Sequence, residues 1–342
     1  MTITRYLTFI TCHSSTNEYD GGFISSFTTT DPSRIVKKVN SASALGDAPA
    51  HLAVVRGGTE VLAADYNSGT VAAYTLSGDK LSFTGGQKIG PFPSASNISH
   101  PHQVVEYGKE VFIPDLVSQS NLRRRIFADC ILGSRQGLAS CQGLLGLVRF
   151  RLHRSTCRLW PSPYCHKVRS TCHPNYLFSL QNRGNVVFVL HELANTLVAQ
   201  YISYAPSNTA SIPTFSTVSV LPPAIPGDVT PGRFHAAELI LSLDGQYLYA
   251  SNRDTSATPD PRGDAIAIIR VAGNGSLTVV KHVFTGLQLL RGFSLSPDGK
   301  YLIGGGQAAG GVAAWAIVSG GGDLKEVARN SAGPAATGFT WL

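Results

Sequence analysis

Two near-copies decide the fold of this chain: residues 242–249 (SLDGQYLY) and residues 296–303 (SPDGKYLI), 54 residues apart. Each copy places an Asp-Gly pair before an apolar run, and glycine supplies the positive φ that tight turns between β-strands require. Each copy therefore predicts a hairpin turn followed by a strand. Repeats of this length are typical of propellers or solenoids, in which each repeat is one small structural unit.

The same unit recurs along the whole chain. A turn glycine precedes an apolar run, and a polar residue follows seven or eight positions after the glycine; the glycines are Gly58, Gly108, Gly184, Gly245 and Gly299. Equivalent positions of radially repeated sheets lie on one rim, so we expect Glu192, Arg253 and Gln307 to converge. The glycine spacings are 50, 76, 61 and 54 residues, and the second spacing is out of line.

The composition is that of a globular protein, with 43% hydrophobic and 14% charged residues among 342. Many turn formers and few charges indicate an all-β protein of short strands, and we expect residues 1–342 to form a single domain. No apolar stretch approaches the ~18 residues of a spanning helix. Residues 6–11 (YLTFIT) read as a strand rather than a signal segment, so we expect a cytoplasmic protein without a membrane partner.

The C-terminal residues 338–342 (GFTWL) are predicted as a strand that pairs beside the N-terminal strand. This pairing would close a ring of sheets. In a propeller, such closure leaves few unpaired strand edges exposed to solvent. The alternative, an open β-solenoid, needs capping ends that the sequence does not show.

Residues 117–181, called the basic segment here, hold what is unusual in the composition. They carry nine Arg and one Lys against one Asp, whereas the whole chain has a net charge of +7. The strand pattern disappears between Leu116 and Asn182, which predicts one disrupted blade. The positive charge is local, and aromatic residues are not interleaved with it, so we expect no nucleic-acid partner.

Three interpretations of the basic segment are a disordered surface insertion, an Arg-rich RNA-binding arm and a zinc site. The zinc ligands would be Cys130, Cys141, Cys157, Cys165, His166, Cys172 and His173. Zinc modules usually carry close C-x₂-C pairs, and this segment has none. We therefore expect no metal.

A fourth interpretation, a mistranslated gene structure, explains more features of the basic segment than the other three do. The codons for residues 135–142 and 160–165 can read one frame over as ordinary strand sequence, the latter as Gly-Pro-Arg-His-Ile. The flanks can encode intron ends. Removing two retained introns would bring the long glycine spacing near the ~40–50 residues of a blade.

Four polar blocks flank the predicted strands, at residues 100–103 (HPHQ), 191–195 (HELAN), 251–254 (SNRD) and 290–293 (LRGF). His100-Pro101-His102, the His191 and Ser251 blocks and the turn at residues 296–299 (SPDG), in this order, resemble the seven-bladed lactonase family. That family includes bacterial-type 6-phosphogluconolactonase and fungal 3-carboxy-cis,cis-muconate lactonizing enzyme. The resemblance spans residues 50–342 with the basic segment as a gap, and residues 1–50 more weakly.

The resemblance implies a seven-bladed β-propeller with a rim cluster of one His, one Glu and two Arg. By motif, the His falls on His102 or His100, the Glu on Glu192 and one Arg on Arg253. The other Arg belongs to a Gly-Pro-Arg-His motif that has no counterpart in the chain as written. We predict catalytic roles for His102, Glu192 and Arg253, and substrate binding by His100, Arg291 and Gln307.

Lactone chemistry requires such a set. Arg forks bind a carboxylate or phosphate, and a Glu or His acts as general acid or base. No metal or cofactor is required if Arg stabilises the oxyanion. We therefore expect a 6-phosphogluconolactonase-type lactonase acting on a small anionic lactone or its carboxylic acid. Carboxymuconate cyclisation, a non-catalytic propeller scaffold and an inactive mis-spliced product are the alternatives.

Plainer interpretations stand beside these roles. His102 could be a buried hydrogen-bonding residue, and Glu192 a solvated residue or the partner of an adjacent Arg. Arg253 could form an exposed pair with Asp254 or Asp260, which would contribute little. His191 should point away from Glu192 because side chains alternate along a strand, so we assign it a structural role.

Overall fold

The computed structural model consists almost entirely of strands, which confirms the all-β prediction. It describes residues 7–13, 21–29, 37–76, 82–91, 99–107, 110–114, 128–129, 147–151, 169–171, 178–180, 186–201, 214–223, 232–336, 338–339 and 341. Two short 3₁₀ helices, η1 (Arg56–Gly58) and η3 (Ser319–Gly321), are the described helices. None of the described helices has the length and hydropathy needed to cross a membrane.

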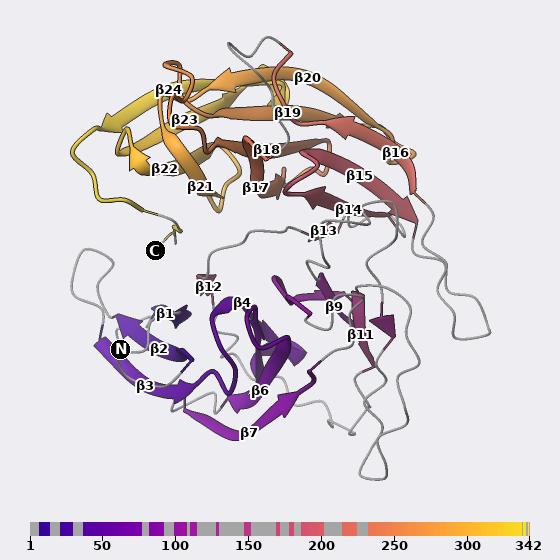
Figure 1. Cartoon of the computed structure of the whole chain (residues 1–342), viewed down its shortest axis with the longest axis vertical. Helices are drawn as coiled ribbons and strands as arrows, with labels where there is room; N and C mark the ends of the chain where they lie inside the picture. Colours follow the sequence, from indigo (N-terminus) through magenta and orange to yellow (C-terminus); the bar gives the residue numbers. More distant parts are fainter. Residues whose placement is uncertain are drawn as a thin grey trace, which may run out of the picture. The chain divides into compact units, whose positions relative to one another are not determined.

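The chain divides into two compact units, residues 1–172 with residue 342 (the N-terminal unit) and residues 173–341 (the C-terminal unit). The C-terminal unit contains three four-stranded antiparallel sheets whose strand order follows the chain (Figure 1). Their strands are β13 (Phe178–Leu180), β14 (Val186–His191), β15 (Thr196–Tyr201) and β16 (Thr214–Ser219); β17 (Phe234–Leu241), β18 (Tyr247–Asp254), β19 (Ala265–Val271) and β20 (Leu277–Phe284); and β21 (Gln288–Leu295), β22 (Tyr301–Ala309), β23 (Val312–Val318) and β24 (Asp323–Asn330).

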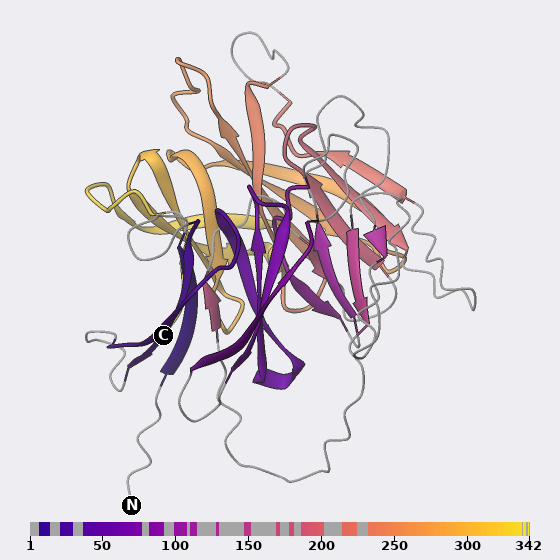
Figure 2. The same ribbon diagram turned by 60° about the horizontal axis from the view of Figure 1, so that its bottom comes forward.

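The N-terminal unit also contains three four-stranded sheets, seen from a second direction in Figure 2. One follows the chain order, with β4 (Pro49–Val55), β5 (Glu60–Asp65), β6 (Thr70–Leu76) and β7 (Phe83–Ile89). The second has the order β12 (Arg169–Thr171), β1 (Leu7–His13), β2 (Phe23–Thr29) and β3 (Lys37–Ser43). The third has the order β10 (Ala128–Asp129), β11 (Leu147–Arg151), β9 (Glu110–Pro114) and β8 (Val105–Tyr107).

Strands from the basic segment break the regular pattern. Although the regular strand pattern of the sequence disappears between Leu116 and Asn182, the short strands β10 to β13 lie there. Leu147–Arg151 (LVRFR) alternates apolar and polar residues, which is the period of a strand. The described parallel pairings, β1 with β12 and β10 with β11, both use strands of this segment.

The predicted closing strand at the C-terminus is also wrong. Gly338, Phe339 and Trp341 are not in a strand. The edge of β1 that we expected them to occupy pairs instead with β12, while the other edge of β1 pairs with β2. A strand has two edges, so β1 has no place for a third partner.

The two near-copies form the same turn. Gly245 and Gly299 adopt φ of 71° and 72°, as the Asp-Gly pairs predicted. In each turn the serine hydroxyl donates to the aspartate over 2.6 Å and accepts from the tyrosine amide over 2.9 Å. The connection is longer than a two-residue hairpin, because β17 ends at Leu241 and β18 begins at Tyr247.

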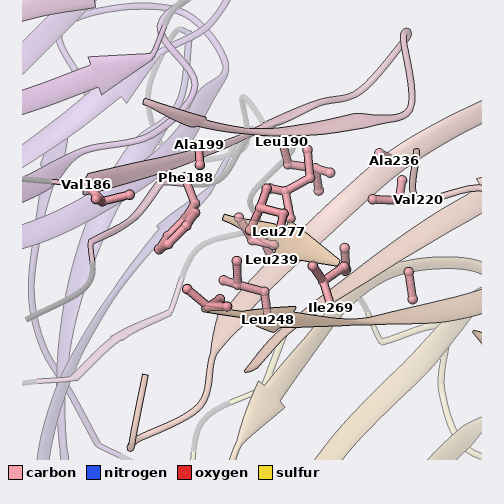
Figure 3. Close-up of a cluster of buried hydrophobic side chains, with 14 residues drawn as sticks. Val186, Phe188, Leu190, Ala199, Val220, Ala236, Leu239, Leu248, Ile269 and Leu277 are labelled. Carbon is pink, nitrogen blue, oxygen red and sulfur yellow. The ribbon is translucent and has the colours of Figure 1, made fainter. Parts of the chain in front are cut away.

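The central strands β18 and β19 are buried on both faces, which explains why the first half of β18, residues 247–250 (YLYA), reads as a continuous apolar run. Leu248 of β18 packs in one cluster with Phe188 of β14 (Figure 3). Ala250 belongs to the same cluster, whereas Tyr249 packs with Trp315 of β23 in another. Successive side chains of a strand thus serve two different cores. This double burial fixes the strand register, since a one-residue slip would exchange the two faces.

Asp65 is a buried carboxylic acid at the end of β5. Its side chain is inaccessible to solvent and accepts a 3.2 Å hydrogen bond from the Thr70 hydroxyl. Burial raises its pKa to about 8, and the opposing effects of Thr70 and Lys88 are smaller. The folded protein therefore holds a proton on Asp65 that the unfolded chain releases above pH 4.

We expect Asp65→Asn to become increasingly stable relative to the wild type as pH rises. Folding raises the pKa of Asp65, so the wild-type protein releases a proton when it unfolds above pH 4. The free energy of unfolding of the wild type therefore falls between about pH 4 and pH 8, by up to about 1.4 kcal/mol per pH unit. Asparagine carries no such proton. Urea unfolding at pH 5, 6, 7 and 8 measures the difference, with Glu106→Gln as the exposed-carboxylate control. Parallel pH profiles for the wild type and Asp65→Asn would contradict the buried neutral acid.

Candidate active site

Glu192 begins the turn that joins β14 to β15. Asn195 lies in this turn at a φ of 50°, a left-handed conformation that Asn tolerates better than most residues. Its side-chain amide donates a 2.7 Å hydrogen bond to the Phe234 carbonyl, and the Ala236 amide donates to the Glu192 carbonyl over 2.9 Å. The turn is therefore fixed to the first residues of β17 in the adjacent sheet.

Arg253 and His235 lie opposite each other on β18 and β17, where they form a cross-strand pair. Both side chains reach Glu192. Nη2 of Arg253 donates to Oε1 of Glu192, and Nδ1 of His235 lies 3.2 Å from the same oxygen. We call Glu192, His235 and Arg253 the acid–base cluster.

The three side chains of the acid–base cluster differ in exposure. Glu192 and Arg253 are 11% and 8% exposed, whereas His235 is 27% exposed. Nε and Nη2 of Arg253 also donate to the carbonyls of His235 and Ala236. Among the described residues, Nη1 of Arg253 has no hydrogen-bond acceptor.

A second ion pair lies beside the acid–base cluster and joins Asp254, the last residue of β18, to Arg233, which immediately precedes β17. Arg233 binds Asp254 bidentately, with distances of 3.0 Å from Nε to Oδ1 and 2.7 Å from Nη2 to Oδ2. Burial alone would raise the pKa of Asp254, but Arg233 and the amides of Ser256 and Asp260 outweigh it and lower the pKa. This pair fixes the end of the ladder beside the acid–base cluster.

The alternative that pairs Arg253 with Asp254 or Asp260 is wrong. Asp254 is taken by Arg233, and Asp260 binds Arg262 at 2.7 Å. The partner of Arg253 is Glu192, 61 residues away in the chain. The pair is also nearly buried, unlike the exposed contact that this alternative assumed.

Asp264 connects the end of β18 with β21. Its two carboxylate oxygens accept from the backbone amides of Asp254 and Leu290, over 2.8 Å and 2.7 Å. Burial raises its pKa to about 6 against the lowering effect of these two bonds. Each of these two amides neighbours a predicted site residue. Arg253 immediately precedes Asp254, and Arg291 immediately follows Leu290.

The remaining predicted residues lie in different places. His100 and His102 belong to the N-terminal unit, where Nδ1 of His100 lies 2.8 Å from the Tyr66 carbonyl. The His100 ring stacks on Tyr66 at 4.5 Å, and buried His102 meets the edge of Tyr66 at 5.4 Å. This buried packing fits the plainer interpretation of His102, and the catalytic role of His102 stays a prediction.

In the C-terminal unit, Arg291 lies half-buried in β21 at a register shift, and Gln307 is exposed in β22. Gln307 is not part of the hydrogen-bonded group around Glu192. Nδ1 of His191 lies 3.0 Å from Oγ1 of Thr196, and burial lowers the pKa of His191, which agrees with its structural assignment.

His235 is the member of the acid–base cluster that the sequence did not reveal. It is no part of the glycine repeat, and its block, residues 232–235 (GRFH), matched no motif. The proposed zinc ligands and residues 160–165, where the shifted frame places an Arg, lie outside the described residues.

Comparison with known proteins identifies the relatives of this chain. A family described as "Lactonase, 7-bladed beta-propeller" matches residues 4–118 and 143–341, so most of the basic segment lies inside the match. A curated protein of Arthroderma benhamiae, "Probable 6-phosphogluconolactonase", is 26% identical over 267 residues. The aligned region covers 75% of this chain but only 58% of that protein's length.

Solved structures show the same fold at low identity. The periplasmic gluconolactonase of Pseudomonas aeruginosa aligns with a TM-score of 0.64 and 16% identity, over 95% of this chain and 85% of that chain. A Lactobacillus plantarum protein gives a TM-score of 0.64 and 20% identity, over 96% and 86%. The propeller prediction and the family resemblance are confirmed.

We expect the Glu192–Arg253 pair to be strongly coupled in a double-mutant cycle. Glu192→Leu leaves a nearly buried guanidinium without its carboxylate and should cost about 3 kcal/mol, whereas adding Arg253→Met should recover part of that loss. Urea unfolding of the two single variants and the double variant measures the coupling.

The exposed pair Lys281–Asp323, with a 2.7 Å contact in the same unit, provides the control cycle. Its coupling should be below about 1 kcal/mol, because both side chains are solvated. Equal coupling for the two pairs would show that Glu192 and Arg253 do not meet in a buried setting.

Proposed function

Because the chain belongs to the seven-bladed β-propeller lactonase family, we propose that it hydrolyses a small acidic lactone to the open-chain acid. The observation that carries this proposal is the acid–base cluster at the end of β18. The guanidinium of Arg253 and the imidazole of His235 both contact Oε1 of the Glu192 carboxylate. Lactone opening needs a group that moves protons and a cation that binds the acid, and this cluster contains both.

The names of the relatives support a hydrolase. The fungal relative is named for 6-phosphogluconolactone hydrolysis and the Pseudomonas structure for gluconolactone hydrolysis. Both substrates are sugar lactones. The proposed substrate class is therefore a sugar-derived lactone that carries a phosphate or carboxylate, for which 6-phosphogluconolactone is the first probe.

Arg253 supplies the positive charge in this proposal. Its Nε and Nη2 are held by protein acceptors, so its direction is fixed before a ligand arrives. Nη1 then binds the substrate anion or the oxyanion that develops when water attacks the lactone carbonyl. A preorganised donor stabilises that charge without reorganisation, and the proposed mechanism requires no metal.

Arg291 is proposed as the second cation of the site. Strand β21 contacts both β17 and β18, and Asp264 binds the amide next to Arg291 and the amide next to Arg253. Asp264 thus ties together the backbone segments that carry the two arginines, and two such cations would suit a substrate with two acidic or polarised ends. In the family motif an Arg of Gly-Pro-Arg-His provides such a charge, and this chain has no counterpart of it.

We expect Glu192→Gln to lower kcat for 6-phosphogluconolactone by about 10²-fold or more, with a smaller change in KM. Glutamine still accepts from Arg253 but removes the negative charge and the titratable carboxyl group of the acid–base cluster. Coupled detection of the free acid, corrected for spontaneous hydrolysis, measures the rate, with EDTA present in a parallel series.

Glu326→Gln serves as the matched control, since Glu326 is an exposed carboxylate paired with Arg329 in the same unit. It should keep the wild-type rate. The same preparations are given 3-carboxy-cis,cis-muconate, because cyclisation is the alternative reaction of the family. Turnover of muconate alone would replace hydrolysis by cyclisation, and turnover of neither compound would reject an enzymatic role on these substrates.

A further inference from the structure

We propose that His235 is a catalytic residue of this site: its imidazole takes the proton from the attacking water and returns it to the leaving ring oxygen. This role rests on the proposed lactonase function. It gives the proton transfer to a residue outside the predicted set of His102, Glu192 and Arg253.

Exposure distinguishes His235 from its two partners. Glu192 and Arg253 are covered to about nine-tenths, whereas more than a quarter of the His235 side chain reaches solvent. A ligand that arrives from solvent therefore meets the imidazole more readily than the carboxylate behind it. Glu192 is placed to orient the ring, and His235 is placed to contact the reacting atoms.

The ring of His235 is held at both nitrogens. Nδ1 lies 3.2 Å from Oε1 of Glu192, and Nε2 lies 3.1 Å from the Gly232 carbonyl. Both partner oxygens can only accept, so the protonated ring donates to both. The charged carboxylate is the stronger acceptor, so in the neutral ring the hydrogen stays on Nδ1 and the lone pair is on Nε2. Nε2 is thus the basic atom, and the exposed Gly232 carbonyl beside it receives the hydrogen bond once Nε2 is protonated.

The charges around His235 support this assignment. Glu192 faces Nδ1, and Arg253 lies opposite on β18 with its guanidinium directed to Glu192. Arg233, two residues earlier on the chain, is neutralised by Asp254. The imidazole therefore has one carboxylate as its direct partner, and a proton gained at Nε2 is stabilised by that carboxylate through the ring.

The step balances without any further reactant. A water oxygen forms a bond to the lactone carbonyl carbon while one water proton moves to Nε2 of His235. The bond between that carbon and the ring oxygen then breaks, and the proton on Nε2 moves to the ring oxygen, which becomes a hydroxyl. The new carboxylic acid loses its proton to solvent, and His235 returns to its starting form.

The test compares His235→Gln with the wild type on 6-phosphogluconolactone. Glutamine can still donate to Glu192, so the local structure is kept while the basic nitrogen is removed. We expect kcat to fall by about 10²–10⁴-fold with KM within about threefold, and the acidic limb of the kcat pH profile to disappear. In His235→Ala, added imidazole should restore part of the rate, since the lost side chain leaves a reachable space.

His282→Gln is the matched control. His282 lies in β20 of the same sheet, half-buried, with its Nε2 3.2 Å from the Val220 carbonyl. This variant should keep the wild-type rate and pH profile. Retained kcat in His235→Gln, or a loss confined to KM with the acidic limb intact and no rescue by imidazole, overturns the role of His235 alone. Absence of lactone turnover by the wild type rejects the proposed function, and this role with it.

Discussion

Oxygen Oε1 of Glu192 is the point at which two sheets of the C-terminal unit meet. It receives Nη2 of Arg253 and Nδ1 of His235 from the β17–β18 ladder, while the backbone carbonyl of Glu192 accepts the amide of Ala236. A nearly buried carboxylate is tolerated where a cation faces it with good geometry, and leaving either charge alone would be costly. The turn after β14 and the first residues of β17 are therefore placed by the same contacts that build the acid–base cluster.

Packing and hydrogen bonds elsewhere in the C-terminal unit fix the register of β18, which carries Arg253. Leu248 and Tyr249 of β18 enter different cores, so the strand cannot slip by one residue without exposing both. The Arg233–Asp254 pair closes the end of the ladder, and Asp264 accepts a hydrogen bond from the amide of Asp254. Arg253 is consequently flanked by fixed positions before any ligand binds.

The sequence predicted the strands and the contact between Glu192 and Arg253, but it did not predict the contact with His235. The reason is physical. The Asp-Gly turns predicted the start of β18. The positions of Glu192 and Arg253 at the ends of equivalent strands predicted that the two side chains lie close together. Counting back from Leu241 opposite Leu248 would place Ala236 opposite Arg253. A bulge between Ala236 and Leu239 shifts the ladder by one residue, so His235 takes that position instead. No residue pattern in the chain marked this bulge, and a one-residue shift reverses which side chains share a face.

The proposed proton-transfer groups lie apart from the basic segment in the chain. Glu192, His235 and Arg253 all belong to the C-terminal unit, whose sheets follow the chain order, and all three residues follow the basic segment in sequence. The irregular parallel pairings lie in the N-terminal unit. The family motif adds one residue from this region, the Arg of Gly-Pro-Arg-His, and that residue would hold an anion rather than move a proton. In the proposed function, this departure from the family motif therefore concerns the binding of an acidic substrate, whereas the groups proposed for proton transfer are in contact.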